Sequence, residues 1–250
     1  SLDSPLSESN KPVWGTCPIQ PPITNANIQT AVDLWVSDPA AATITYGAIS
    51  TWDVSQVTDM SELFRDKTTF NDDISNWDVS NVTNMNMMFY NTTSFNQDIG
   101  GWDVSSVADM YGMFAGTSFN QDIGSWDVSS VADMYGLFYN TTSFNQDIGA
   151  WDVSSVIDME YMFYDAISFN QDISGWCVTN IVSEPSVFSL DSPLSESNKP
   201  AWGTCPNTLT PITDANIQTA VNDWVSDPSA ATTTYGVISD WDVSQVTDMS

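Results

Sequence analysis

The chain has 250 residues, with 4 lysine and arginine residues against 32 aspartate and glutamate residues and no histidine, and its formal net charge is −28 at pH 7. Nucleic acids and anionic membranes would repel such a chain, so we expect neither as a partner, whereas cations and cationic surfaces stay open. Hydrophobic residues make up 42% of the chain and aromatic residues 12%, which is enough for a folded core.

The sequence also disfavours a membrane segment and an enzyme. No apolar run approaches the ~18 residues of a membrane-spanning helix, and we expect any signal peptide or anchor to lie outside these residues. The lack of histidine removes the most frequent general base and the most frequent metal ligand. Paired carboxylates need unlike surroundings to act on glycosides, whereas the aspartates here recur in every repeat. We therefore expect no catalytic residue.

The opening segment of the chain returns near its end. Ser-Leu-Asp-Ser-Pro-Leu-Ser-Glu-Ser-Asn-Lys-Pro begins at Ser1 and again at Ser189, so one large unit has about 188 residues. Residues 1–22 and 183–211 are rich in proline and serine. Because proline fixes φ and lacks a backbone donor, we expect both segments to be extended connectors between blocks.

Residues 23–50 carry the pattern of an amphipathic helix and a lead-in. After a Thr24 cap, an apolar stripe follows helical spacing, and Asp38-Pro39 stops it. The same stripe returns within residues 212–250, which we expect to hold the capping helix and first coil of the next block. A helix here would close the exposed end of a repeat core. The paired stripe positions are Ile28 and Ile217, Ala31 and Ala220, Val32 and Val221, and Trp35 and Trp224.

Residues 51–182 form a short-period repeat marked by tryptophan, mostly as Trp-Asp-Val. The steps are 24 or 25 residues, at Trp52, Trp77, Trp102, Trp126, Trp151 and Trp176. In the coil from Trp126 to Ala150, apolar residues fall on one face of a short helix, namely Val131, Met134, Leu137 and Phe138. Ser130 with Asp133 fits a capping box at its start. A short extended segment follows, containing Phe144 and Ile148.

A single coil of this kind cannot cover its own apolar faces, so we expect the coils to stack. The predicted fold class is an α/β repeat, a solenoid of about 25-residue strand-turn-helix coils with an N-terminal capping helix, arranged as tandem blocks. Stacking would turn the consensus tryptophan, phenylalanine and isoleucine positions into core ladders. The phenylalanine and isoleucine ladders are Phe70, Phe95, Phe119, Phe144 and Phe169, and Ile74, Ile99, Ile123, Ile148 and Ile173.

The positions of the three cysteines are explained by the repeat of the large unit. Cys17 and Cys205 occupy the same position in successive units, and Cys177 replaces the aspartate of the last Trp-Asp-Val block. We predict a disulfide between Cys177 and Cys205, with Cys17 paired to a preceding unit; the alternative is three buried free thiols. Disulfides would place the chain in an oxidising, extracellular compartment.

Three Asn-X-Thr sequences, at Asn81, Asn91 and Asn140, are glycosylation acceptors that point to the same compartment. Asn91 and Asn140 each stand 14 residues after a repeat tryptophan, two coils apart. Glycans attached there would leave the stack from one face.

The aspartates form columns, and two interpretations are open. Like charges stacked in a column repel one another, so something must offset the repulsion. In the first interpretation each carboxylate accepts hydrogen bonds from the backbone of its own turn. In the second interpretation the column binds Ca2+. The metal candidates are Asp78, Asp103, Asp127 and Asp152. No other cofactor is expected. A parallel column of asparagines predicts stacked amides rather than a ligand site, and consists of Asn71, Asn96, Asn120, Asn145 and Asn170.

The stretch from Phe119 to Phe138, Phe-Asn-Gln-Asp-Ile-Gly-Ser-Trp-Asp-Val-Ser-Ser-Val-Ala-Asp-Met-Tyr-Gly-Leu-Phe, resembles the repeat of the BspA-like leucine-rich-repeat surface proteins, from roughly Trp52 to Trp176. The segment from Ala41 to Ser50 resembles segments that precede such repeats in algae, especially diatoms. The resemblance implies a right-handed leucine-rich-repeat-like solenoid on an extracellular surface, with a role in adhesion or structure and no catalytic residues. Arrays of six Trp blocks that are themselves repeated depart from the family picture and favour a filament.

Two functions are compatible with this sequence. The first is an extracellular structural glycoprotein whose tandem blocks form or decorate a filament, such as a fibril, a flagellar hair or an adhesive strand, with other copies of itself as partner. The second is a multivalent cell-surface adhesin for glycans or proteins. Tyrosines in variable positions of the repeat motivate the second function, namely Tyr90, Tyr111, Tyr135, Tyr139 and Tyr164.

Overall fold

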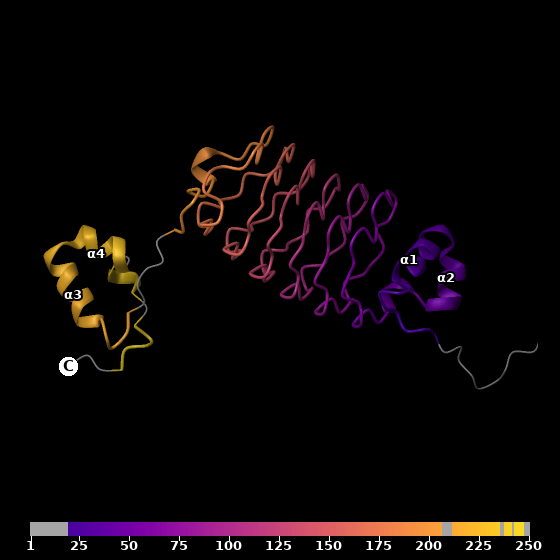
Figure 1. The fold of residues 1–250 in the computed structure, drawn as a ribbon, viewed down its shortest axis with the longest axis horizontal. Coiled ribbons are helices and arrows are strands. Elements are labelled where there is room, and N and C mark those ends of the chain that lie inside the picture. The colour runs from indigo at the N-terminus through magenta and orange to yellow at the C-terminus, as the bar shows by residue number, and fades with distance from the viewer. Residues whose placement is uncertain (1–19, 207–211, 236–237, 242, 248–250) are drawn as a thin grey trace, which may run out of the picture.

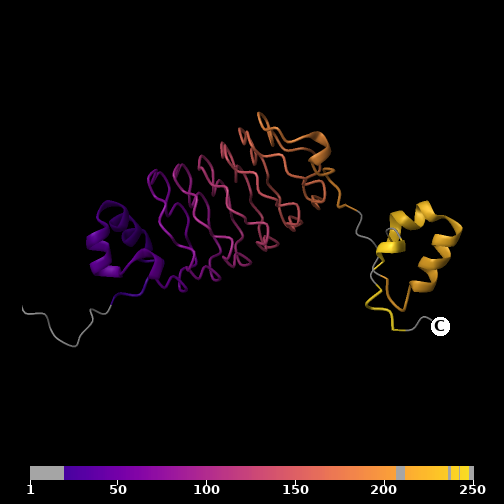
Figure 2. The same cartoon turned by 180° about the vertical axis from the view of Figure 1, so that it is seen from behind.

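The computed structural model describes residues 20–206, 212–235, 238–241 and 243–247 (Figure 1). Cys17 and most of the connector predicted for residues 1–22 therefore lie outside the described residues. The helices are α1 (Ile28–Ser37), α2 (Pro39–Tyr46), α3 (Ile217–Ser226) and α4 (Pro228–Tyr235), with short 3-10 helices at Ile49–Thr51, Glu196–Asn198 and Ile238–Asp240. Between α2 and α3 lies a long stack of coils, seen from opposite sides in Figures 1 and 2.

Helices α1 and α2 form a pair at the N-terminal end of the stack. Helix α1 begins at Ile28, directly after Asn27, and not next to Thr24 as the sequence suggests. Asp38 and Pro39 end α1 and also start α2, because the Asp38 carboxylate accepts a hydrogen bond from the backbone of Ala41 and proline at the first helical position needs no donor. The aspartate and proline that were expected only to stop a helix therefore connect two helices.

The apolar stripe of α1 covers the first coil of the stack. Ile28, Ala31 and Val32 are buried in the core cluster that continues through the stack. Trp35 packs edge-to-face on Trp52, with ring centroids 6.1 Å apart. The α1–α2 pair thus shields apolar surface that would otherwise face water at this end of the core.

The predicted strand-turn-helix coil is wrong. Within the residues that the structure describes, the coils contain neither a sheet nor an α-helix. Successive coils are joined instead by single parallel bridges, in one continuous column: Asp59 to Asn84, Asn84 to Asp109, Asp109 to Asp133, and Asp133 to Asp158. The α/β leucine-rich-repeat-like class is therefore replaced by a stack of coils built almost wholly from turns.

The segment expected to be helical is a run of consecutive turns. In one coil, Met113 donates its backbone N–H to the carbonyl of Met110, and Ala115 donates to Gly112 in the next turn. Gly112 and Gly116 have φ of 56° and 70°, in the left-handed region that an α-helix cannot contain. Apolar residues spaced three and four apart fit such turns as well as they fit a helix, which is why the periodicity misled.

Two left-handed positions recur in every coil, four residues apart. The first position accepts various residues, namely Glu62, Met87, Gly112, Gly136, Tyr161 and Val187. The second holds only aspartate, asparagine or glycine, the residues that tolerate this conformation best: Asp66, Asn91, Gly116, Asn140, Asp165 and Asp191. A regular column of these three residue types is the sequence signal that the helical interpretation overlooked.

Left-handed residues aim alternate N–H groups along the stack. Met110, Gly112, Phe114 and Gly116 donate to four carbonyls of the following coil at 2.8 to 3.0 Å. The carbonyl acceptors are those of Asp133, Tyr135, Leu137 and Tyr139. Each coil therefore satisfies its backbone through the next coil rather than through a helix or a sheet of its own.

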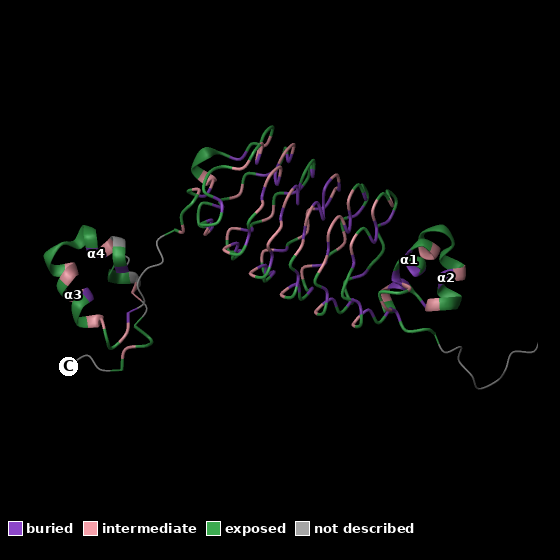
Figure 3. Cartoon of the chain, viewed as in Figure 1, coloured by how far each residue is buried: buried purple, intermediate pink, exposed green. Residues whose placement is uncertain are grey.

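The core consists of ladders that run the length of the stack. The predicted tryptophan, phenylalanine and isoleucine positions are all buried (Figure 3). Phe114 stacks on Phe119 in its own coil at 4.2 Å and on Phe138 of the next coil at 5.8 Å. Each buried indole N–H is also paired; that of Trp102, for example, donates to the carbonyl of Ile74 in the preceding coil. Aromatic stacking and paired donors together stabilise the interior.

Residues 183–206 close the C-terminal end of the stack. Phe163 and Asp165 donate their backbone N–H groups to the carbonyls of Phe188 and Leu190, as earlier coils do to their successors. Phe188 is buried in the core cluster. This part of the expected extended connector is therefore packed as a further, irregular coil.

A disulfide joins this irregular coil to the last Trp block. It links Cys177 and Cys205, as the sequence predicts. Among the described residues, no helix is long and apolar enough to cross a membrane.

Candidate functional site

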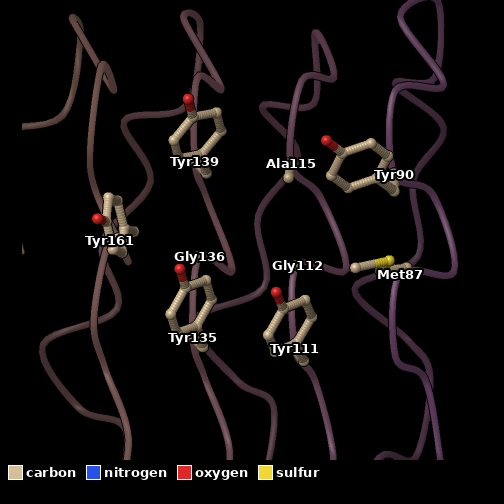
Figure 4. A pocket seen from close by; sticks show the side chains of 9 residues that line it. All are labelled: Met87, Tyr90, Tyr111, Gly112, Ala115, Tyr135, Gly136, Tyr139 and Tyr161. Atoms are coloured by element: carbon tan, nitrogen blue, oxygen red, sulfur yellow. The ribbon is translucent and has the colours of Figure 1, made fainter.

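A face rich in tyrosine is the main candidate site. On coils two to five, rings project from two neighbouring rows of turn residues (Figure 4). Tyr111 and Tyr135 stack at 4.8 Å with nearly parallel planes, and Tyr139 and Tyr164 stack at 5.1 Å in the second row. Tyr161 contacts both rows, at 5.3 Å from Tyr135 and 5.9 Å from Tyr164. The structure thus brings together the five tyrosines named from the sequence and adds Tyr161.

All of these rings except that of Tyr164 line an open groove of about 350 Å³ on the surface of the stack. Its floor consists of Gly112, Gly136 and Ala115, where a larger side chain is missing from the repeat. Figure 4 shows Ala115 lying between Tyr90 and Tyr139. Small residues under a row of rings create room for a ligand, and we treat this groove as the candidate binding site.

The tyrosine hydroxyls are available to a ligand. None of those on this face donates or accepts a hydrogen bond within the described residues. Burial raises the pKa of Tyr111, and the charges of Asp133 and Asp158 raise it further. For Tyr164 the charge of Asp165 is the main cause of a raised pKa. The hydroxyls of Tyr111 and Tyr164 therefore stay protonated at neutral pH and lie in a negative electrostatic field.

One ring of this face already carries a cation. The Arg65 guanidinium lies over the Tyr90 ring, 5.3 Å from its centroid. This distance is that of a cation–π interaction. Arg65 also forms ion pairs with Glu62 at 3.1 Å and Asp66 at 3.6 Å. The chain therefore shows how a flat cation packs at one end of the tyrosine row.

The aspartates proposed as Ca2+ ligands each close their own turn. Asp103, for example, accepts hydrogen bonds from the backbone and hydroxyl of Ser105 at 3.1 and 2.6 Å. The hydroxyl bond and then the backbone bond lower the pKa of Asp103. Asp78, Asp127 and Asp152 accept the equivalent backbone bonds, from Ser80, Ser129 and Ser154. Among the described residues, no group of three or more acidic or cysteine side chains is arranged to hold a metal ion.

A different aspartate column, not singled out from the sequence, lies beside the tyrosines. Asp109, Asp133 and Asp158 follow one another at the bridge position of successive coils. Asp133 accepts a hydrogen bond from the backbone of Tyr135, so it does not form the capping box expected with Ser130. Partial burial is the main cause of its raised pKa, and the charges of Asp109 and Asp158 add to it. The signal for this column was an aspartate directly before the Met of four blocks, with asparagine at Asn84 in the remaining one.

The polar columns predicted from asparagine are present. The Asn96 side-chain oxygen accepts from the backbone of Asn120, and Gln121 donates to the backbone carbonyl of Asn96. The pattern repeats from coil to coil, and in later coils Gln146 and Gln171 also donate to the side-chain oxygens of Asn120 and Asn145. These side chains therefore link successive coils both to the backbone and amide to amide.

The three glycosylation acceptors are all exposed. The side-chain nitrogen of Asn81 donates to the carbonyl of Ser55, and that of Asn91 donates to the Asp66 carboxylate. Within the described residues, the Asn140 nitrogen forms no hydrogen bond. Asn140 therefore offers the nitrogen that a glycan needs without breaking a contact.

Comparison with known protein families shows to which family these repeats belong. A family model described as "Mycoplasma protein of unknown function, DUF285" matches residues 38–131 and again residues 115–204, which together span more than half of the chain. The chain belongs to this family. The two tandem matches fit the expected likeness to repeat proteins of the BspA-like kind at a coarse level. No curated protein and no solved structure gives a significant match.

Proposed function

We propose that the chain is a segment of an extracellular structural glycoprotein in which stacks of this kind follow one another to form or decorate a filament. The observation that carries the proposal is the recurrence of one large unit with the same elements. Helix α3 (Ile217–Ser226) repeats α1 (Ile28–Ser37) at an offset of 189 residues, and α4 repeats α2 at the same offset. Equal units in series along one chain favour an elongated object.

The arrangement of the stack supports the proposal. The α1–α2 pair covers one end of the core, and residues 183–206 with the Cys177–Cys205 disulfide cover the other. This large unit is thereby closed at both ends, and a unit closed in this way can be repeated without exposing its core. A disulfide and three exposed glycosylation acceptors are typical of secreted or cell-surface proteins.

The length of purified tandem arrays tests this proposal. Chains with one, two and four large units, produced through a secretory pathway, are imaged by electron microscopy. We expect rods whose length rises in proportion to the number of units, with a regular axial repeat in the native material. Compact particles whose length does not follow the number of units would contradict the proposal.

A second function, multivalent adhesion, is supported by the tyrosine groove. One groove per large unit would give weak individual contacts that add up along a tandem array. The test compares retention of one-unit and four-unit chains on immobilised cell-surface material at equal unit concentration. Retention that rises steeply with the number of units supports adhesion, and equal retention contradicts it.

A further inference from the structure

One row of the tyrosine face is a ladder of flat groups with a rung missing. Its positions are equivalent in successive coils and hold Arg65, Tyr90, Ala115, Tyr139 and Tyr164. Arg65 packs on Tyr90 at 5.3 Å, and Tyr139 packs on Tyr164 at 5.1 Å with planes 8° apart. Of these five positions, only Ala115 contributes no flat group.

The space above Ala115, where the other four coils of this row have a flat group, is an open cavity. A cavity of about 220 Å³ lies over Ala115, lined by Tyr90, Asn91, Ala115, Gly116, Tyr139 and Asn140. It shares Tyr90, Ala115 and Tyr139 with the larger groove, so the two hollows adjoin one another. In Figure 4, Tyr90 and Tyr139 stand on either side of Ala115. The slot therefore has an aromatic residue at each end and a small-residue floor.

The dimensions suit a flat group in contact with both rings. Tyr90 and Tyr139 are two coil steps apart, and neighbouring rungs of this row are 5.1 to 5.3 Å apart. A group centred above Ala115 would thus lie about 5 Å from each ring, within the range of about 6 Å over which a cation interacts with an aromatic face.

Charge decides among the flat groups that would fit. The chain has a net charge of −28, and Asp66 and Asp165 occupy the next residue position on coils of the same row. Asp133 and Asp158 raise the pKa of Tyr111, and Asp165 raises that of Tyr164, so the surrounding potential is negative. A positively charged planar group is favoured over a neutral sugar or a phenyl ring, and a guanidinium is the planar cation of proteins.

The chain itself has no spare guanidinium for this slot. Arg65 is its only arginine, and it already packs on Tyr90. Lys67 pairs with Asp33, and Lys199 pairs with Glu184 and Glu196. The fourth cation, Lys11, lies outside the described residues. A second copy of the chain is therefore a poor source of the missing group, and a different, basic protein is the better one.

We infer that the slot over Ala115 binds an arginine side chain of a basic partner protein, with the guanidinium stacked between Tyr90 and Tyr139. The Arg65–Tyr90 pair is the internal precedent for this packing. The inference names the ligand of the adhesive function proposed above, and it does not depend on whether the arrays form a filament.

The chain for this test is produced without glycans, because the acceptors Asn91 and Asn140 line the slot. A peptide of alternating arginine and serine is the probe, with a lysine–serine peptide of equal length and a neutral hexasaccharide for comparison. Binding is measured by titration calorimetry near physiological salt. We expect the arginine peptide to bind severalfold more tightly than the lysine peptide, and no binding of the sugar. Equal binding of the two peptides, or preferential binding of the sugar, would overturn the inference.

The decisive variant is Ala115→Tyr. It fills the slot with a tyrosine ring, as the equivalent positions of other coils do with Tyr90, Tyr139 and Tyr164. It leaves the net charge unchanged, so loss of binding cannot come from weaker long-range attraction. We expect about tenfold weaker binding of the arginine peptide. Ala150→Tyr, which adds the same ring at an exposed position outside the groove, should leave binding unchanged. Unchanged affinity in Ala115→Tyr would refute the proposed slot.

Two further variants keep the test independent of any folding defect. Ala115→Ser leaves the slot open and should retain binding. Tyr139→Ala removes one exposed ring and should weaken binding severalfold, while its circular dichroism spectrum stays that of the parent chain. Tight binding by Tyr139→Ala, or loss of binding by Ala115→Ser, would count against the inference.

Discussion

The two copies of the leading helix pair share a sequence pattern but differ in what covers them. On the α1–α2 copy, the stack follows, and Ile49 and Val54 retain 2% and 0% of their surface exposed. On the α3–α4 copy, the described residues include only the start of a coil, and the equivalent Ile238 and Val243 are 43% and 37% exposed.

Polar contacts show the same difference. Asn25 bonds to the backbone of Thr58, and Asp214 bonds in the same way to Thr247 of the second copy, so the first turn of a coil forms in both. In the first copy, Gln29 also bonds to the Leu63 carbonyl and Trp35 to Asp72, on the part of the coil that follows this first turn. The helix pair thus starts a coil locally, whereas burial of its apolar residues depends on the coils that follow.

The tryptophan ladder offers the largest test of this comparison. Trp102→Ala removes a buried ring and leaves the Ile74 carbonyl without its partner, so we expect a loss of about 3 to 5 kcal/mol in unfolding free energy. Trp241→Ala, in the second copy, removes a ring that is only partly buried and should cost clearly less. Denaturant unfolding followed by circular dichroism measures both. Equal losses would contradict the dependence on stacking.

The disulfide tests how the far end of the stack is closed. Cys177 and Cys205 are 28 residues apart, and a loop of that length predicts a loss of about 3 to 4 kcal/mol in the double Cys→Ser variant. We expect faster hydrogen exchange at Phe163 and Asp165, whose N–H groups bond to the irregular coil. Exchange in the α1–α2 pair should stay unchanged, because that pair covers the opposite end. A uniform rise in exchange along the stack would show that the closure is not local.

Two neighbouring glycines separate contacts between coils from effects within a coil. A Cβ atom at Gly100 would clash with the backbone oxygen of Asp122 on the next coil, whereas one at Gly101 would meet nothing within 4 Å. Gly100→Ala should therefore cost about 1 to 3 kcal/mol in thermal or denaturant unfolding, and Gly101→Ala less than about 0.5. Equal stability of the two variants would show that the coils are not packed as closely at Gly100 as the structure indicates.

The smallest predicted effect concerns like charges along the stack. The folded chain holds Asp133 with a raised pKa, so its charged form costs stability at neutral pH. Asp133→Asn keeps the turn, since Asn84 serves in the same column, and should add roughly 1 kcal/mol at pH 7. The gain should vanish as the pH falls through the folded pKa, because Asp133 is then neutral in the parent.

Asp127→Asn is the matched control with the opposite sign. Hydrogen bonds from Ser129 lower the pKa of Asp127, so its charge supports the fold above the ordinary pKa of aspartate and this support is lost at lower pH. We expect this variant to be less stable than the parent at pH 7. A gain in stability from both substitutions would mean that the overall negative charge outweighs the local bonds.

The core residues could be predicted from the sequence, but the local backbone conformation of the coils was predicted wrongly. The spacing of Trp102, Phe119 and Ile123 is enough to place these residues in ladders, because only stacking can bury them. The local backbone was mistaken for a helix, because Met134, Leu137 and Phe138 fit both a helix and consecutive turns. The decisive information was the glycine, asparagine or aspartate at the second left-handed position, which only a comparison of all coils reveals.

The candidate site was predictable in part. Tyrosines in variable positions were expected on one face, and the structure gathers them there. The groove could not be foreseen, because it arises from what is missing at Gly112, Ala115 and Gly136. Tyr161 escaped notice because it occupies a position that holds glycine in the two preceding coils.

Backbone hydrogen bonds that point from each coil to its successor have a mechanical consequence. They lie along the stacking direction, so a pull on the two termini loads one coil after another in series. Each coil that detaches frees about 25 residues, or roughly 80 to 90 Å of extended chain. Stretched by its ends, the molecule should lengthen in equal steps and act as an extensible tether.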